Sequence, residues 1–546
     1  MRILAAALAA VSIGQAQDQR SHARSLVITQ QGIVATSHTL ASQAGAQILA
    51  RGGSAVDAAI AANAVLSVTE PMMCGPGGDL FVLYRDAKTR RLTGLNASGW
   101  TGKRVPQLTG VMPSSGIHTV TVPGAVDGWS RMHKRFGRLP WKSLFGPAIH
   151  YAEKGYPVPE ILSGAWLNPT VSHLNEQGRR LFLPDGRSPQ SGDVFRNPEI
   201  VRFFRVLADQ GSDAFYRGEI ARAILKTSDL LGGTLAADDL AEFQSEWVDP
   251  ISTDYRGWRI YELPPNGQGM AALQILNILE TFRPAAGGPR SLEELHKRIE
   301  ATKIAYADLL RFNADPRTAK APVAGLISKQ YARKRAEFVD PAKASCDVSA
   351  GNPPSGDTTY LSVVDRDGNI ASWIQSISAA WGSGIPVEGF GFILHNRGSF
   401  FVLDPKHPNV LAPRKRPFHT IIPAFMERGE VRIGFGIMGG SNQPLAHAQW
   451  VSNIVDFGMN MQAAMEEPRY TKRTFAGCEV SIESRIPPAT IDALRELGHN
   501  VTVHRDYSIF MGRGQAVMHD SRRKVNFGAS DPRADGSAEP EPPATP

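Results

Sequence analysis

A loose connector that runs directly into a strong strand hairpin constrains this chain more than any other feature. Residues 345–354 (SCDVSAGNPP) are small, polar and rich in proline and glycine, which predicts an exposed linker. Residues 359–365 (TYLSVVD) and 370–376 (IASWIQS) have strand composition, and Asp367-Gly368 between them is a hairpin signal. Thr358 therefore begins a strand at the end of a linker.

The position of Thr358 permits a particular form of nucleophilic catalysis. Inside a chain, a threonine hydroxyl is a weak nucleophile, and this one has no obvious base. As a new N-terminus it would carry its own base, because an α-amine with a reference pKa of about 7.7–8.0 accepts a hydroxyl proton near neutral pH. The Asp357–Thr358 bond must first be cut, and a linker that leads into a rigid strand suits such a cut. Spacing alone leaves this as one option among several.

Size and charge argue against several classes of protein. The 546 residues, 42% hydrophobic and 20% charged, can bury at least one large core, and we expect two structural units. The formal net charge of +7 is mild and the basic residues are dispersed, with short clusters only at 414–416 and 522–524. Nucleic-acid binding is therefore not favoured. No apolar stretch approaches the ~20 residues that span a bilayer.

The cysteines and histidines predict neither a disulfide framework nor a metal site. The three cysteines are scattered and contain no CxxC pair: Cys74, Cys346 and Cys478. Beside the 75–78 loop, Cys74 is expected to be a small buried residue rather than a reactive thiol. The 14 histidines do not cluster, and structural roles are expected for His395, His407 and His419. We expect no metal and no cofactor.

The two ends of the chain carry different signals. Arg2 precedes a short apolar run at residues 3–13, and the small residues Gly14 and Ala16 occupy positions that a signal peptidase recognises. We expect residues 1–16 to be a cleaved signal peptide that directs the protein to the periplasm or outside the cell; an ordinary N-terminal helix is the alternative. Residues 534–546 lack an apolar face and are expected to form a disordered tail.

Two helices are predicted with their boundaries. Ser54 and Asp57 form a capping signature ahead of a helix over residues 58–68. A second helix is predicted over residues 291–312, with one face on a sheet, from apolar side chains at helical spacing: Leu292, Leu295, Ile299 and Tyr306.

A series of motifs runs in order along nearly the whole chain. They are GGSAVDAA (52–59), EP (70–71), GPGG (75–78), TVPGA (121–125), PPNGQG (264–269), EATKIAYAD (300–308), DTTYLSVVDRDGN (357–369), GG (439–440) and ASDPR (529–533). In this order the motifs resemble the γ-glutamyltransferase (γ-glutamyltranspeptidase) family of N-terminal-nucleophile hydrolases. This many ordered matches are not expected by chance.

The resemblance implies an α+β fold, a four-layer αββα sandwich of the N-terminal-nucleophile hydrolase type. A large subunit (17–357) and a small subunit (358–546) would stay together after self-cleavage at Asp357–Thr358.

The resemblance also assigns catalytic roles. Thr358 matches the nucleophile, which attacks the carbonyl of a small-molecule amide or γ-glutamyl donor and forms an acyl-enzyme; water or an amine, such as an amino acid, then takes the acyl group. Ser376 matches the hydroxyl that supports the nucleophile, with an ordinary strand serine as the alternative. Gly439 and Gly440 match the oxyanion hole, where glycine leaves the amides free to face the developing negative charge.

The same stretch also matches a dinucleotide-binding pattern. Residues 434–439 (GFGIMG) form a GxGxxG after a predicted strand and before a helix from Pro444, and Asp456 lies twenty residues after Gly436. We favour the oxyanion role, because a lone motif of this kind is weak and Asp456 would lie near the end of a helix rather than at the tip of a second strand. The chain contains no GxSxG or HExxH motif.

The donor-binding positions depart from the family pattern. The arginine that grips the donor α-carboxylate falls at Ser98, and the acid that holds the α-amino group falls at Phe400. The remaining donor-binding positions fall at Ser378, Arg397, His419 and Thr420.

A pocket that loses an acid and gains Arg397 attracts a carboxylate and repels an ammonium. We therefore hypothesise an acidic donor without a free α-amine, such as a glutaryl or oxalyl amide, as handled by the acylase-like and oxamate-amidohydrolase-like branches of the superfamily. In the alternative, Arg397 pairs with a protein carboxylate and other residues hold a γ-glutamyl donor.

A non-catalytic binding protein on the same fold is a further alternative. The joint presence of Thr358, Ser376, Gly439 and Gly440 argues against it. Processing separates the two hypotheses, because an active member would yield two fragments and an inert one a single chain.

Overall fold

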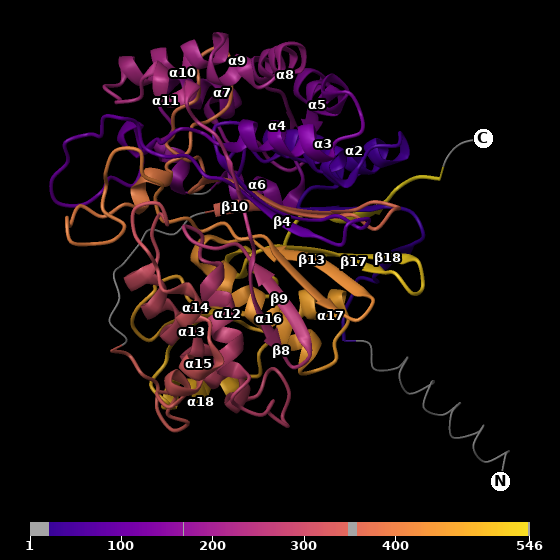
Figure 1. The fold of residues 1–546 in the computed structure, drawn as a ribbon, viewed down its shortest axis with the longest axis vertical. Coiled ribbons are helices and arrows are strands. Elements are labelled where there is room, and N and C mark those ends of the chain that lie inside the picture. The colour runs from indigo at the N-terminus through magenta and orange to yellow at the C-terminus, as the bar shows by residue number, and fades with distance from the viewer. Residues whose placement is uncertain (1–20, 168, 348–356, 544–546) are drawn as a thin grey trace.

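Two stacked β-sheets form the centre of the molecule, and helices cover both outer faces (Figure 1). The computed structural model describes residues 21–167, 169–347 and 357–543. Side chains from both sheets meet in an apolar layer that contains Phe81, Tyr360, Ile374, Phe425 and Val517. The four-layer αββα sandwich predicted from the sequence is confirmed.

Each large sheet has seven strands, all paired antiparallel with their neighbours. In order across the first sheet they are β1 (Val27–Thr29), β18 (Val525–Ser530), β17 (Gly514–Asp520), β13 (Val431–Ile437), β12 (Ala424–Arg428), β9 (Trp258–Glu262) and β8 (Ile251–Tyr255). Across the second they are β19 (Ser537–Pro540), β2 (Ile33–Thr36), β10 (Asp357–Val364), β11 (Ile370–Ser378), β3 (Asp79–Arg85), β4 (Leu92–Ala97) and β7 (Glu246–Val248).

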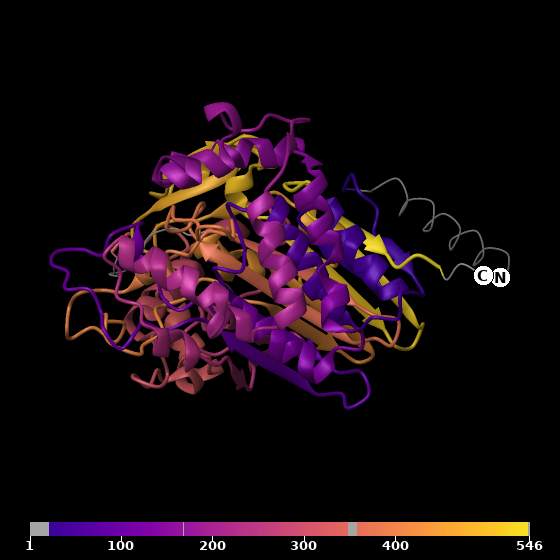
Figure 2. The ribbon, with the colours of Figure 1, turned by 90° about the horizontal axis from the view of Figure 1, so that it is seen from above.

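One helical layer lies on the second sheet and is seen from above in Figure 2. It contains α2 (Thr39–Ala50), α3 (Ala55–Thr69), α4 (Ala125–Phe136), α5 (Gly146–Lys154), α6 (Glu160–Trp166), α7 (Glu176–Phe182), α8 (Pro198–Gln210), α9 (Asp213–Tyr216), α10 (Glu219–Leu230) and α11 (Ala237–Ala241). Helix α3 is buried along its whole length, which its Ala-rich sequence permits. The short β5 (Tyr156–Pro157) and β6 (Val194–Phe195) pair within this layer.

The other helical layer covers the first sheet. It contains α12 (Gly269–Leu279), α13 (Leu292–Phe312), α14 (Val323–Leu326), α15 (Lys329–Ala336), α16 (Gln443–Val455), α17 (Met461–Glu466) and α18 (Pro488–Glu496). A small sheet joins β14 (Tyr470–Thr471), β15 (Glu479–Glu483) and β16 (Asn500–His504). No helix in the described ranges is long and apolar enough to cross a bilayer.

The local predictions with clear patterns are confirmed. Ser54 caps α3 through a reciprocal bond with Asp57, the predicted 291–312 helix is α13, and the hairpin is β10–β11. Cys74 is free and buried, with 1% of its surface exposed.

The dinucleotide-binding alternative is wrong. Gly434 and Gly436 lie on β13, between two antiparallel neighbours, whereas a dinucleotide fold needs parallel strands. Both glycines are needed for close packing between the sheets, because an added Cβ would lie 2.6 Å from Ile370 and 2.5 Å from Tyr360.

Two expectations about the chain's extremities and cysteines need correction. Residues 537–540 of the expected disordered tail form β19, because their backbone pairs with β2 and the Glu541 carboxylate accepts the Gly32 amide at 2.9 Å. Cys346 and Cys478 form a disulfide although 132 positions separate them, so spacing along the chain gave no signal for it. The predicted signal peptide, residues 1–16, lies outside the described residues.

The two segments on either side of Asp357–Thr358 are interleaved. Each large sheet contains strands from both: β10 lies between β2 and β11, and β9 pairs with β12. A cut at this bond would therefore leave the two products joined through the middle of both sheets.

Candidate active site

Thr358 lies at an irregularity in the β10–β11 ladder. Asp357 is opposite Ser378 and Thr359 is opposite Gln375, so Thr358 faces two residues of β11 instead of one. This is a β-bulge, a feature that redirects a side chain at the end of a strand. The Thr358 side chain is fully buried.

Ser376 accepts hydrogen bonds from several groups around the nucleophile. Its Oγ accepts from the Ser378 amide at 2.7 Å and from Arg397 at 3.1 Å, and the Thr358 hydroxyl donates to it at 3.4 Å. Ser378, whose amide donates to Ser376, has φ of 81°, in the left-handed region that is strained for a residue with a side chain. The bulge and this strained residue place three polar groups around one hydroxyl.

A turn between β13 and α16 carries the predicted oxyanion hole. Gly439 has φ of 132° and Gly440 has φ of 62°, which disfavour any side chain there. Among the described residues, neither glycine amide has a hydrogen-bond partner. Their N–H groups are therefore available to an oxyanion.

Two glutamines that sequence analysis missed hold this turn and the nucleophile. Gln443 Nε2 donates to Thr358 Oγ1 at 3.4 Å, while its Oε1 accepts the Ile422 amide at 3.0 Å. Gln268 Nε2 donates to the carbonyls of Thr420 at 2.6 Å and Gly440 at 2.8 Å. Gln443 follows the motif at 439–440, and Gln268 lies within the motif at 264–269. This closeness to a motif was the only signal in the sequence for either glutamine.

Arg397 is fully buried beside the nucleophile. Its guanidinium donates to Thr420 Oγ1 at 2.8 Å and to Ser376 Oγ at 3.1 Å. Burial lowers the pKa of Arg397 to about 10, and the nearby Asp79 charge opposes this shift. Within the described part of the chain, no carboxylate forms an ion pair with Arg397, and its Nε has no hydrogen-bond partner.

Other fully or nearly fully buried arginines differ in this respect. Arg416 pairs with Glu246 at 2.8 Å, Arg469 with Asp531 at 2.8 Å and Arg533 with Glu483 at 2.7 Å. A buried cation without such a partner is costly and marks a functional site more often than a structural one. No carboxylate of the described residues lies within ion-pair distance of Arg397, but the charge of the buried Asp79 acts on it from farther away, so the alternative in which a protein carboxylate offsets Arg397 stays open.

Asp79 and two histidines form the polar wall behind Arg397. His419 Nε2 donates to Asp79 Oδ2 at 2.9 Å and its Nδ1 accepts the Ile421 amide, so the ring is neutral. Burial lowers the pKa of His419 to about 3. Burial alone would raise the pKa of Asp79, but His395, His419 and Arg397 outweigh it and lower the value to about 2. Asp79 is therefore ionised and sets the negative charge of this wall.

Ser98 is close to this wall but its hydroxyl is already engaged. It donates to Asn96 Oδ1 at 2.7 Å and accepts from Asn266 Nδ2 at 3.2 Å. Ser98 thus completes a network of buried amides. Of the predicted donor-binding residues, Ser378 and Arg397 contact Ser376 and Thr420 contacts Arg397. His419 contacts Asp79, and Ser98 contacts asparagines.

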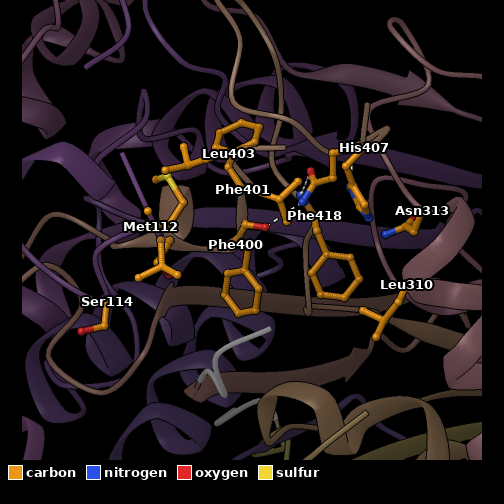
Figure 3. A pocket seen from close by; sticks show the side chains of 14 residues that line it. Met112, Ser114, Leu310, Asn313, Phe400, Phe401, Leu403, His407 and Phe418 are labelled. Carbon is orange, nitrogen blue, oxygen red and sulfur yellow. Dashed lines mark hydrogen bonds between the residues drawn. The ribbon is translucent and has the colours of Figure 1, made fainter. Parts of the chain in front are cut away.

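A cavity of about 500 Å³ is lined by Ser399, Phe400 and Phe401, but Arg397 is not among its lining residues. Phe400 and Phe418 lie together in its wall, with Leu310 and Met112 at the sides (Figure 3). The Arg397 guanidinium lies 5.3 Å from the centre of the Phe400 ring. Phe400 therefore separates an apolar cavity from a buried cation.

Two stacked sheets with a threonine at the start of a central strand, beside two free glycine amides, define the N-terminal-nucleophile hydrolase class, and comparisons with known proteins agree. The sequence profile of the gamma-glutamyltranspeptidase family matches residues 41–541. The chain belongs to this family.

Similar proteins span almost the same length. The glutathione hydrolase-like YwrD proenzyme of Bacillus subtilis is 36% identical, over 94% of this chain and 99% of that protein. The oxamate amidohydrolase proenzyme of Klebsiella pneumoniae is 34% identical, over 94% and 98%. The crystal structure of a cephalosporin acylase from Bacillus halodurans is 38% identical and superposes with a TM-score of 0.88, over 95% and 97%.

Proposed function

We propose that this chain is a proenzyme that cleaves itself at Asp357–Thr358. Thr358 Oγ attacks the carbonyl carbon of Asp357, the acyl group moves from nitrogen to oxygen, and water hydrolyses the resulting ester. The products are a carboxylate at Asp357 and a free α-amine at Thr358. The position of Thr358 at a bulge, with Ser376 and Gln443 at its oxygen, supports this proposal.

In the mature enzyme, the new α-amine takes the proton of Thr358 Oγ as that oxygen attacks the donor amide. The carbonyl oxygen becomes negative and is held by the Gly439 and Gly440 amides, each worth about 3–4 kcal/mol of transition-state stabilisation. The α-amine returns its proton to the leaving amine. Water or an acceptor amine then attacks the acyl-enzyme and regenerates Thr358.

The preferred donor is an amide of a dicarboxylic acid that lacks a free α-amine. The observation that carries this proposal is the buried Arg397 without a carboxylate partner. In this proposal the Arg397 guanidinium binds the donor carboxylate, and Phe400 carries no carboxylate to pair with an ammonium. The relatives whose names refer to oxamate and cephalosporin substrates agree with an acidic donor of this kind.

Donor profiling tests this assignment. Purified, processed protein is assayed with the p-nitroanilides of glutarate, oxalate and γ-glutamate, which differ only in the acyl group. Faster turnover of the glutaryl or oxalyl compound is expected. If the γ-glutamyl compound is turned over much faster than both, the acidic-donor proposal is wrong and the protein is a glutathione hydrolase.

Processing and export are tested by mass spectrometry with N-terminal sequencing. We expect fragments of about 37–38 kDa and about 20 kDa, at ~0.11 kDa per residue, with the smaller one beginning at Thr358. The larger one should begin near Gln17 if a signal peptide is removed on export to the periplasm or outside. A single uncut and inactive chain would favour the non-catalytic alternative.

A further inference from the structure

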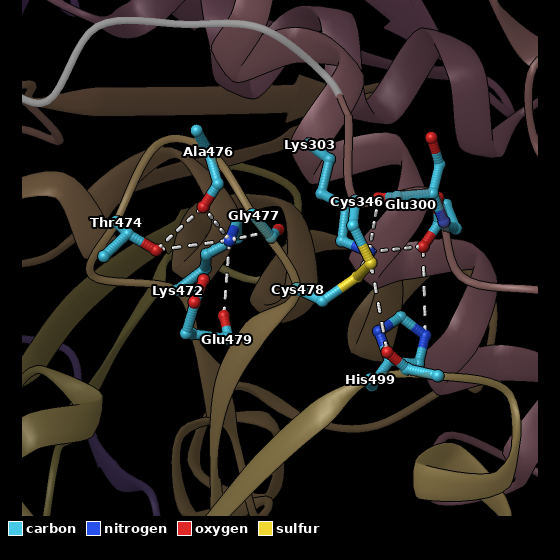
Figure 4. The surroundings of a disulfide bond; sticks show 12 residues. Glu300, Lys303, Cys346, Lys472, Thr474, Ala476, Gly477, Cys478, Glu479 and His499 are labelled. Carbon is cyan, nitrogen blue, oxygen red and sulfur yellow. Dashed lines mark hydrogen bonds and ion pairs between the residues drawn. A yellow bond between two sulfur atoms is a disulfide. The ribbon is translucent and has the colours of Figure 1, made fainter.

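The disulfide joins residues on opposite sides of the proposed cleavage bond. Cys346 lies eleven positions before Asp357, and Cys478 lies at the entry to β15 (Figure 4). A cut at Asp357–Thr358 would therefore turn this link within one chain into a link between two chains. This consequence rests on the self-cleavage proposed above.

Both halves of the disulfide are held in place by other contacts. On the Cys346 side, the Ser345 amide donates to Glu300 at 3.2 Å and the Ala344 amide donates to the Leu497 carbonyl at 2.7 Å. On the Cys478 side, Lys472 Nζ donates to the carbonyls of Ala476 at 2.7 Å and Gly477 at 2.8 Å. Contacts other than the disulfide itself thus also fix the positions of the two cysteines.

The two sulfur atoms have unequal surroundings. Cys346 is exposed, whereas Cys478 is only 8% exposed. Lys303 Nζ lies 3.6 Å from Cys478 Sγ and is fixed by Glu300 at 2.7 Å and by the Ser345 carbonyl at 2.9 Å. An ammonium at this distance stabilises a thiolate on Cys478.

A group of three possible metal ligands lies next to Lys303. His296, Glu300 and His499 offer ligand atoms within 4.8 Å of one another. However, Glu300 is bonded to Lys303, and His296 Nδ1 and His499 Nε2 share a hydrogen bond of 2.8 Å. The positive charge next to this group is therefore the ammonium of Lys303 rather than a metal ion.

We propose that Cys346–Cys478 is a thiol-addressable covalent tether between the two subunits of the processed protein, with Cys346 as the site of attack. A small external thiolate attacks Cys346 Sγ and forms a mixed disulfide there. The Cys346–Cys478 bond breaks, and its electron pair leaves with Cys478 as a thiolate beside Lys303. The exposed sulfur is attacked and the sulfur with the nearby cation leaves, as thiol–disulfide exchange favours.

Gel electrophoresis under denaturing conditions tests the tether. With reductant, two fragments are expected; without reductant, after alkylation of free thiols, one band of the combined mass is expected. Two bands in both lanes would overturn the tether and leave the cleavage intact. One band in both lanes would overturn the cleavage and with it the tether between subunits; alkylation then tests the disulfide alone, and should label only Cys74 before reduction and all three cysteines after it.

The site of attack is tested with the monothiol 2-sulfanylethanesulfonate on the native protein, followed by peptide mapping. A mixed disulfide on Cys346 is expected, and one on Cys478 would overturn the assignment. Lys303→Gln should slow the exchange by about three- to ten-fold, because the leaving thiolate loses its cation. Lys226→Gln, at an exposed ion pair with Glu388, is the matched control. A folded Lys303→Gln protein with an unchanged rate would contradict the role of Lys303; if that variant does not fold, the peptide map decides.

Discussion

Around Thr358 the side chains that contact its hydroxyl oxygen are neutral: the hydroxyl of Ser376 and the amide of Gln443. The donor end, beyond Ser376, is charged, with Arg397 and Asp79 buried there. We call the groups at Thr358, together with the Gly439–Gly440 turn, the neutral half of the site, and Arg397 with Asp79 the charged half. The neutral half matches the family motifs, whereas the charged half departs from the family pattern at Arg397. If the function proposed above holds, the chain shares its reaction with the family and differs from it in the charge of the group that selects the donor.

The neutral half is tested by Thr358→Ala. This change removes the attacking oxygen for both cleavage and turnover, so one uncut chain and a loss of activity of at least about 10⁴-fold are expected. Thr358→Ser, which keeps a hydroxyl, should still be cut. Electrophoresis and a p-nitroanilide assay measure both effects. A cut or active Thr358→Ala protein would refute the assignment of the nucleophile.

The sequence predicted the neutral half better than the charged half for a physical reason. A strand hairpin and a capped helix follow from local chemistry, so β10–β11 and α3 could be predicted, whereas the glycine pair at 439–440 was found through the family motifs. Gln268 could not be placed, because its partners, the carbonyls of Thr420 and Gly440, are more than 150 positions away. The Cys346–Cys478 bond was missed for the same reason.

The charged half also shows that a side chain at a predicted position can already have hydrogen-bond partners within the protein. Ser98 was expected to bind the donor because it replaces an arginine, yet its hydroxyl is used by Asn96 and Asn266. Only the three-dimensional structure shows which hydrogen-bonding groups remain available. The tail at 537–540 is a similar case, because a polar segment becomes a strand once β2 offers its free edge.

The charged half is tested by Arg397→Met. Loss of a charged hydrogen bond to the donor carboxylate is expected to lower kcat/KM for a glutaryl amide by roughly 10- to 100-fold. Self-cleavage should slow less, because Arg397 contacts Ser376, which in turn contacts Thr358. Arg416→Met is the control, since Arg416 is equally buried but paired with Glu246. Equal losses for acidic and neutral donors would show that Arg397 only shapes the site.

Acid sensitivity follows from Asp79 and His419. The pKa of Asp79 is lowered to about 2, so its stabilisation is present above pH ~4 and is lost as the pH falls toward 2. The pKa of His419 is lowered to about 3, so the unfolded chain binds more protons and stability falls as the pH drops from ~6.5. Asp79 is expected to contribute about 2 kcal/mol at neutral pH.

Thermal unfolding between pH 7 and pH 3 measures this dependence. Asp79→Asn should lower Tm at pH 7 and reduce the difference between Tm at pH 7 and at pH 3. Asp193→Asn is a suitable control, because Asp193 is a surface residue paired with Arg187. If the Tm of the Asp79→Asn protein falls with pH as much as that of the parent protein, Asp79 does not cause the acid sensitivity.

Phe400→Asp tests whether the donor preference depends on the charge of the side chain at position 400. The new carboxylate would lie near the Arg397 guanidinium, which is 5.3 Å from the Phe400 ring centre, and would compete with a donor carboxylate for it. It would also offer an acceptor to a donor ammonium. The ratio of kcat/KM for γ-glutamyl over glutaryl p-nitroanilide is therefore expected to rise by about ten-fold, the value of 1.4 kcal/mol. Phe400→Leu keeps the site apolar and should leave the ratio unchanged. If both variants shift the ratio equally, the shape of the cavity rather than its charge selects the donor. The difference in charge between the two halves of the site would then not explain the donor preference.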